Sequence, residues 1–484
     1  MKNYINYIII ALFLVGCNDF EELNVNPNEP TSVASGVLFT SALRTAVNTS
    51  SNESFLLANN IAQLTAKTLR TEVDSYNWNA FPTLWEGMYE SLTDLEGVIS
   101  ISEEMGNNQA KGAAMVVKAW VYATLTNAYG DIPYSNAIKG SEANFTPNYD
   151  TQESIYSDLL ASLDDAVNLL NSSGEIEGDI IYGGDTILWQ KFANSLQLRL
   201  LLHASKNMNV ASKFSSIVNQ GVIFNSNEEQ ASLSFLNTFP NQFPTRPLKI
   251  GDFDAVALSQ TSLNVLSSLN DPRLSRYARP ENDNYDTPTF LGVENGVGGQ
   301  TGSRLGVAYY DYPGLVSSND LGVQTAEGLM MTYAELEFIL AEAALRGWIT
   351  DSVEDHYKKG LEASHNYYSV NYTPYGWDDF EDFYSNSGVA YDEEMDLLEQ
   401  KWLGVFFTGM EPYFELRRMY VLNNGWEGLR FISAPIGTNA NDYKLPMRFL
   451  YPGQEQSLNQ ANYREASSRY SEGDTMNGKM WIVN

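Results

Sequence analysis

The stretch that decides the fold is MTYAELEFILAEAALRGW, from Met331 to Trp348, together with SVEDHYKKGLEASHNYY, from Ser352 to Tyr368. Apolar residues recur in it at the spacing of an amphipathic helix. Alanines stand where two packed helices would touch, and Gly347 predicts the end of the first helix. After a break at Ile349 to Asp351, the second segment predicts a helix that returns along the first.

This pair spans roughly 35 residues, which is the length of a tetratricopeptide repeat, and it resembles such a repeat. Any other antiparallel helical hairpin would show the same pattern, so both interpretations stand. Earlier segments have the same helical period, namely 111–129, 151–170 and 187–205. The sequence therefore predicts a mainly α-helical protein, with a helical scaffold over roughly 35–206 and 328–420.

The segments between these helices have a different composition. From about 207 to 327, and again from 422 to 484, glycine, asparagine, proline, aspartate and tyrosine are frequent and apolar alternation is short and irregular. Many aromatic residues argue against disorder. We expect an ordered, loop-rich layer with short strands, carried by the helices, in one domain over 31–484.

The single cysteine, Cys17, follows an apolar run from Tyr4 to Val15. That run has the length of a signal-peptide core and is too short to cross a bilayer as a helix. The sequence LVGC resembles the bacterial lipobox, which implies a signal peptide over 1–16, a lipid on Cys17 and a tether over 17–30. The alternative is an ordinary secretory signal with an incidental cysteine. Acyl chains would hold the protein at a membrane.

Charge narrows the class of partner. The chain has 29 Lys+Arg against 60 Asp+Glu, a formal net charge of −31. Such a surface repels phosphate backbones, so we expect no nucleic-acid partner. The acidic segment NDFEE, which follows Cys17, resembles the export signal of Bacteroidetes surface lipoproteins, although a solvated linker has the same composition. The acidic balance also favours a neutral glycan over a strongly anionic one.

Enzyme motifs are missing from the sequence. The three histidines, His203, His356 and His365, lie on predicted helices, and neither HExxH nor GxSxG occurs. The glycines of ENGVGGQTG lack the spacing of a phosphate-binding loop, and ENDNYD lacks the glycine and terminal glutamate of a calcium loop. Acidic residues are too abundant for any carboxylate pair to indicate glycoside hydrolysis. We expect no enzyme and no cofactor, and nothing supports a calcium site.

The sequence feature that does indicate a function is the set of aromatic residues on predicted loops. Sugar rings pack one C–H face on an aromatic ring, while their hydroxyl groups need polar partners; each aromatic contact contributes roughly 0.5–1.5 kcal/mol. Core packing is the alternative for each ring. The candidate ligand-binding residues are Tyr76, Asn77, Trp78, Tyr285, Tyr309, Tyr310 and Tyr312, with Arg304 and Asn319 as hydrogen-bonding partners.

Several stretches taken together resemble one family, the SusD/RagB-like nutrient-binding outer-membrane lipoproteins of Bacteroidetes, in the branch with an Asn-Pro-Asn tether. The likeness covers almost the whole chain in order. It rests on the lipobox with NVNPNEPT, and on GDIPYSNAI, NDPRLSRYARP, MTYAELEFILAEAALRGW, QKWLGVFFTGMEPYFELRRM and LPMRFLYPGQEQSLNQANY.

The resemblance implies about four tetratricopeptide-like helix pairs that carry irregular ligand-binding loops. It also implies a place on the extracellular face of the outer membrane, above a SusC-like TonB-dependent transporter, and capture of oligosaccharide without catalysis. The loop that holds Trp78 matches one that often stacks on ligand, whereas DPRL and LPMRFLYPGQE are expected to be structural. A neutral glucan such as laminarin is the expected ligand. A receptor for peptides or another nutrient, and a surface glycoside hydrolase, are the alternatives.

Overall fold

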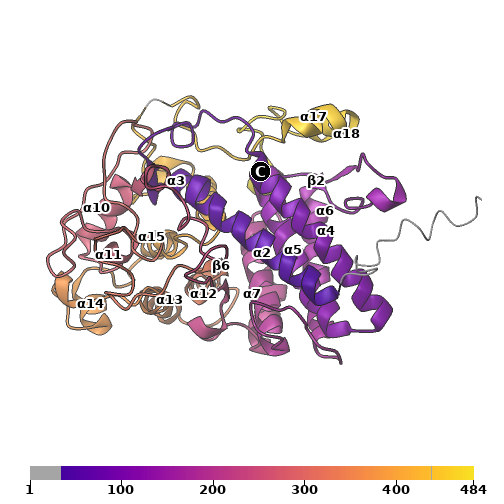
Figure 1. The fold of residues 1–484 in the computed structure, drawn as a ribbon, viewed down its shortest axis with the longest axis horizontal. Coiled ribbons are helices and arrows are strands. Elements are labelled where there is room, and N and C mark those ends of the chain that lie inside the picture. Colours follow the sequence, from indigo (N-terminus) through magenta and orange to yellow (C-terminus); the bar gives the residue numbers. More distant parts are fainter. Residues whose placement is uncertain (1–33, 438) are drawn as a thin grey trace, which may run out of the picture.

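The computed structural model describes residues 34–437 and 439–484, and helices dominate them. The predicted signal peptide, Cys17 and the tether lie outside the described residues. Figure 1 shows α2, α4, α5, α6 and α7 (within 35–204) gathered on one side and α10 to α15 (within 260–404) on the other, while α17 and α18 (453–468) lie above the first group. Among the described residues, no helix is both long enough and apolar enough to span a bilayer.

The first half is a set of helices in which each packs on the next, α4 on α5, α5 on α6 and α6 on α7, while α2 packs on α4. Their starts follow local rules: the side chains of Asn107, Thr151 and Asp185 accept hydrogen bonds from the first free N–H groups of α5, α6 and α7. The bounds are α2 Ser35–Glu53, α3 Asn59–Ile61, α4 Pro82–Met105, α5 Asn108–Tyr129, α6 Gln152–Leu170 and α7 Thr186–Ala204, with a π-helical turn at Ser54–Ala58.

The second half holds the helix pair that the sequence predicts. Helices α12 and α13 pack closely, and Thr332 and Ser352 cap their starts. Gly360 of α13 is needed there, because a Cβ atom would lie 2.9 Å from the ring of Phe338. The bounds are α12 Tyr333–Leu345, α13 Val353–Tyr367, α14 Phe380–Asn386, α15 Glu394–Gly404, α16 Glu411–Leu422, α17 Gly453–Leu458 and α18 Gln460–Ser468. The predicted mainly α fold is confirmed.

The loop-rich layer between α7 and α12 contains short helices that the composition did not predict, as well as short strands. Its helices are α8 Ala211–Gln220, α9 Ile250–Phe253, α10 Gln260–Ser268 and α11 Leu274–Tyr277. The strands of the described residues form two-stranded antiparallel sheets: β1 Thr65–Lys67 with β5 Val256–Leu258, β2 Ile132–Pro133 with β3 Tyr149–Asp150, and β4 Ala231–Leu233 with β6 Gly328–Met331.

The β1–β5 pair joins two distant parts of the chain. Thr65 lies opposite Leu258 and Lys67 opposite Val256, so the loop after α3 is fastened to the layer that lies almost two hundred positions later. One main hydrophobic core runs from Phe39 of α2 to Val483 near the C-terminus. This core includes residues of the helices and of the loop-rich layer, so the layer is packed against the helices.

Candidate functional site

The structure corrects the prediction that Tyr76 and Trp78 present exposed rings. Trp78 is 6% exposed, and its indole N–H donates to the carbonyl of Val73 at 3.0 Å. Its ring packs edge-on against the rings of Tyr413 and Phe449, which come from the far end of the chain. Tyr76 is fully buried beside it. These rings join the loop to the core, and Asn77 between them is exposed.

The rings of the YYDYP segment are buried as well. Tyr309 stacks on Phe407 at 4.2 Å and Tyr310 on Phe253 at 4.6 Å, so both faces of the segment are anchored in the core. Tyr312 is 5% exposed and donates its hydroxyl hydrogen to Asp254. The expected exposure of these three rings is therefore wrong. Aromatic pairs gain energy from packing on each other, and here that packing uses up the faces a sugar would need.

Around Tyr312, however, the layer is hollow. A cavity of about 580 Å³ lies between the loop after β1, the β5 strand and the loops on either side of Gln300. We call it the arginine cavity, because Arg279 and Arg304 line it together with Asp254, Glu281 and Asp283; its other lining residues are Thr68, Leu69, Val256, Ala257, Pro280, Gly299, Gln300, Thr301, Gly302 and Leu315. Of the predicted ligand residues, only Arg304 belongs to this set.

Both arginines of the cavity lie against the ring of Tyr312, which is not itself a lining residue. The guanidinium of Arg304 lies 4.3 Å from the centre of the Tyr312 ring and that of Arg279 lies 5.5 Å from it. Arg304 Nε is 3.3 Å from Asp254 Oδ1, and the Arg304 side chain is 42% exposed. Burial and the hydrogen bond to Asp254 raise the pKa of Tyr312. Arg304 is thus the accessible cation of the cavity, and Tyr312 is its support.

Arg279 is the buried cation. Its side chain is 3% exposed, and Nη2 donates to Asp283 Oδ1 at 2.6 Å and to the carbonyl of Val316 at 2.7 Å. Its Nε and Nη1 groups are buried and have no hydrogen-bond partner. A buried polar group without a hydrogen-bond partner destabilises the folded state by about 1–3 kcal/mol, and a charged group by more. Because these two groups have almost no accessible surface, a ligand in the cavity does not reach them, and Arg304 is the arginine that can donate to it.

Tyr285 lies near these groups on the same loop. It is partly buried, its hydroxyl has no partner, and burial raises its pKa to about 12. Asp283 keeps the loop in place, because it also accepts a hydrogen bond from the N–H of Val316 at 3.1 Å. Asn319 is exposed and lines a neighbouring hollow of about 370 Å³. The roles of Tyr285, Asn319 and Asn77 in ligand binding stay predictions.

The loop after β1 is fixed against the cavity by a buried carboxyl group. Asp74 Oδ2 accepts hydrogen bonds from the N–H of Lys67 at 2.8 Å and from the amide of Asn295 at 3.1 Å. Burial raises the pKa of Asp74 to about 7. Asn295 lies on the loop that continues to Gln300 of the cavity, so Asp74 ties both sides of the cavity together.

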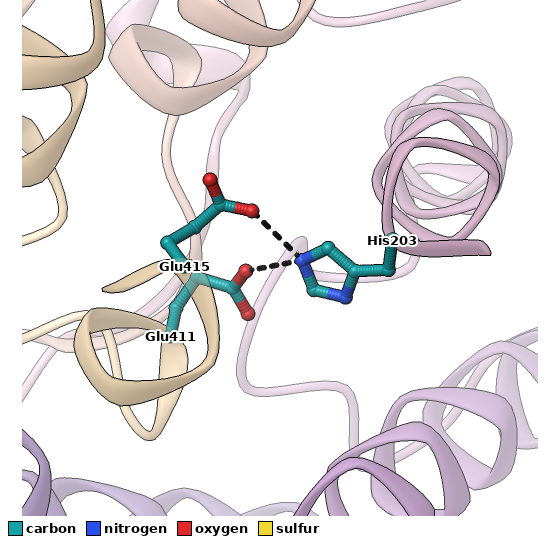
Figure 2. Close-up of side chains that lie close together, drawn as sticks. All are labelled: His203, Glu411 and Glu415. Atoms are coloured by element: carbon teal, nitrogen blue, oxygen red, sulfur yellow. Dashed lines mark hydrogen bonds and ion pairs between the residues drawn. The ribbon is translucent and has the colours of Figure 1, made fainter. Parts of the chain in front are cut away.

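The histidines belong to the scaffold. Figure 2 shows His203 of α7 facing two carboxylates of α16, Glu411 and Glu415, one helical turn apart. Nε2 of His203 is 2.8 Å from Glu411 Oε1 and 3.0 Å from Glu415 Oε1. Burial opposes a charge on His203, but the two carboxylates outweigh it and raise its pKa.

This trio could ligate a metal by residue type, yet it is one end of a buried ion-pair network. The same carboxylates contact Lys401, Arg418 and Arg199, which also pair with Glu342 and Glu335. Protonated His203 balances the charges, because four buried carboxylates then face four buried cations. We interpret the network as a lock between α7, α12, α15 and α16. His365 is buried, and burial lowers its pKa to about 3, so it is neutral at physiological pH.

Sequence reasoning missed Arg279, Asp254 and Asp283. Arg279 stands in the family motif NDPRLSRYARP, of which we expected only DPRL to be structural. Within DPRL, Asp271 and Arg273 form a fully buried pair at 2.6 Å. The available signal was three arginines within seven positions of one motif, Arg273, Arg276 and Arg279, in a chain with about twice as many acidic as basic residues. Which arginine faced the core and which the cavity depended on the fold.

Comparisons with known proteins agree with this architecture. A family model described as starch-binding and associating with the outer membrane matches residues 27–452. A SusD homologue from Bacteroides fragilis is 25% identical with a TM-score of 0.77, covering 93% of this chain and all of that one. A chitin-binding protein is 25% identical with a TM-score of 0.73, covering 93% of this chain and 99% of that one.

A further structure, a SusD/RagB family protein from Bacteroides thetaiotaomicron, has a TM-score of 0.75 at 23% identity and covers 94% of this chain and 99% of that one. The comparison with curated proteins finds no match. The fold is thus the tetratricopeptide-like helical fold of SusD proteins, as the sequence predicts. From the family model and these structural relatives together, this chain belongs to the SusD-like family of outer-membrane-associated nutrient-binding proteins.

Proposed function

We propose that this protein is a cell-surface glycan receptor that binds an oligosaccharide in the arginine cavity without catalysis. The observation that carries the proposal is Arg304, a guanidinium that is 42% exposed in a cavity of about 580 Å³ and can donate to a ligand there. Sugar hydroxyls, or waters held by them, supply oxygen acceptors for such a donor. Family membership and a chitin-binding relative agree with a saccharide ligand.

The charges of the cavity favour a neutral sugar. Arg279 is paired with Asp283 and Arg304 with Asp254, and Glu281 adds a further carboxylate. The cavity therefore has no excess positive charge to offset the carboxylate of an acidic sugar. A neutral glucan such as laminarin or starch, or chitin, fits this balance. Because the Arg304 guanidinium is already paired with a carboxylate, its remaining N–H groups can donate to the uncharged hydroxyl groups of a neutral sugar.

Binding is tested by isothermal titration of purified protein with maltohexaose, laminarihexaose and chitohexaose, beside a library of peptides. We expect one of the hexasaccharides to bind at millimolar to micromolar Kd, and Arg304→Ala to weaken that binding. No binding by any of the three, with measurable peptide binding, would contradict the proposal and favour a peptide receptor. Release of reducing ends during the incubation would contradict a role without catalysis.

The proposal includes delivery from the cell surface. The lipobox predicts a lipid on Cys17 that holds the protein at the outer membrane, and membership of the family suggests a SusC-like TonB-dependent transporter as partner. Mass spectrometry of the mature N-terminus should find an acylated Cys17, protease added to intact cells should cut the protein, and affinity purification from outer membranes should bring down a TonB-dependent transporter. An unmodified N-terminus would contradict the anchor.

A further inference from the structure

A second cavity lies beside the arginine cavity, on the other side of one chain segment. Its volume is about 410 Å³, and it is lined by the turn at Asn227, the end of α13, Arg276 of α11 and the strand-like segment that leads into β6. The segment 304–309 separates the two: Arg304 lines the arginine cavity, whereas Val307 to Tyr309 line this one. The two cavities are therefore neighbours that share a wall.

Two adjacent tyrosines end helix α13 at this cavity, and we call it the tyrosine cavity after them. Tyr367 and Tyr368 are both partly buried, and their rings meet edge to face with centres 4.9 Å apart. Tyr368 is also anchored, because its hydroxyl donates to the carbonyl of Phe406 at 3.1 Å and its ring packs on Tyr277. Here, in contrast to Trp78, aromatic rings line an open hollow.

Polar groups of the tyrosine cavity have capacity to spare. The amide of Asn227 donates to the carbonyl of Ala363 at 2.9 Å and fixes that side chain, and the neighbouring carboxylate of Glu228 is exposed at the cavity as an acceptor. Arg276 donates from Nε and Nη2 to the carbonyl of Ser369, at 3.2 and 2.7 Å. Among the described residues, no carboxylate lies within 4.0 Å of that guanidinium. Its Nη1 group is left for another acceptor.

We infer that the tyrosine cavity is a second saccharide site, with the Tyr367 ring as the stacking surface, Arg276 as the hydrogen-bond donor and the exposed carboxylate of Glu228 as the acceptor. The inference rests on the proposed function, since it takes the ligand to be a saccharide. A ring with one apolar face and hydroxyl edges needs flat aromatic contact, a donor and an acceptor in one hollow, and these residues provide all three. Two sites on one chain would hold two segments of the same polymer, which raises its retention.

The experiment titrates maltohexaose, laminarihexaose and chitohexaose into the full mature chain and into variants by calorimetry. The variants are Tyr367→Ala, Arg304→Ala, the double variant, and Tyr367→Phe as the matched control that keeps the ring. We expect two sites per wild-type chain and per Tyr367→Phe chain. Each alanine substitution should weaken one of them about tenfold or more, so that one site of wild-type affinity remains in either single variant and none in the double variant. A melting curve for each variant checks that it is folded.

The outcomes separate the two claims. If Tyr367→Ala, folded, still binds as many molecules at the same affinity as the wild type, the second site is wrong and the proposed function stands. If the wild type binds one molecule that Tyr367→Ala abolishes and Arg304→Ala leaves intact, the tyrosine cavity is supported and the arginine cavity is wrong. Should none of the three sugars bind the wild type, both claims fail together.

Discussion

Two buried arginines show how the scaffold and the loop-rich layer differ. In the scaffold, Arg418 gives every donor group to a carboxylate: Nε to Glu415 at 3.0 Å, and Nη1 and Nη2 to the two oxygens of Glu342 at 2.7 Å. In the layer, Arg279 is buried as deeply but uses only Nη2. The scaffold uses its charges to hold helices together, whereas the layer keeps hydrogen-bonding groups unused at a cavity.

The sharpest test of this contrast removes a scaffold cation. Arg418→Ala leaves Glu342 and Glu415 as buried carboxylates with fewer partners, and the pKa of Glu342, which Arg418, Lys401 and Arg346 lower to about 2 against the effect of burial, should rise. We expect a loss of about 3–5 kcal/mol in the free energy of unfolding, measured with urea. Arg430→Ala, which breaks an exposed ion pair, should cost less than about 1 kcal/mol. Equal losses would contradict the lock.

Trp78 tests whether a ring of the loop after β1 belongs to the core. Trp78→Ala should lower the free energy of unfolding by about 3–5 kcal/mol, because it removes a packed indole and its hydrogen bond. The folded fraction should bind sugar with the wild-type affinity. Asn77→Ala, at the exposed neighbouring position, should stay within about 0.5 kcal/mol of the wild type. If Trp78→Ala is as stable as the wild type but no longer binds sugar, Trp78 belongs to the ligand site and not to the core.

Asp74 links the two sides of the arginine cavity and predicts a pH dependence. Burial raises its pKa from 3.8 to about 7, so the folded state holds this proton more tightly than the unfolded chain does. Its contribution to stability is full below about pH 4 and is lost as the pH rises towards 7. Asp74→Asn should remove this change of the free energy of unfolding with pH, which amounts to a few kcal/mol at most. The free energy of unfolding is measured with urea at pH 4, 5.5 and 7. If it changes with pH by the same amount in the wild type and in Asp74→Asn, the raised pKa of Asp74 is contradicted.

Arg304 should change binding more than stability. Its side chain is partly exposed and its ion pair with Asp254 is open to solvent, so Arg304→Ala should alter the free energy of unfolding by less than about 1 kcal/mol. Loss of a charged donor should weaken oligosaccharide binding about tenfold or more. Arg70→Ala, at an exposed arginine of the loop after β1 outside the cavity lining, is the matched control and should bind normally.

The sequence predicted the scaffold well because its signals are local. Apolar spacing and capping residues such as Thr332 and Ser352 set where α12 and α13 begin, and those features lie within a few positions of each helix. Burial of Trp78 depended on Tyr413 and Phe449, more than three hundred positions away, and no local pattern reports such contacts. For the same reason only one of the two cavity arginines was predicted: Arg304 was found, and Arg279, one of three arginines at or beside α11 with different surroundings, was missed.

The measurement that tests the central claim most directly is a crystal structure of the protein with the hexasaccharide that binds most tightly. The account predicts sugar in the arginine cavity, with oxygen atoms or bridging waters within hydrogen-bond distance of Arg304. Sugar bound only elsewhere on the chain, with the arginine cavity unchanged and filled by solvent, would contradict it.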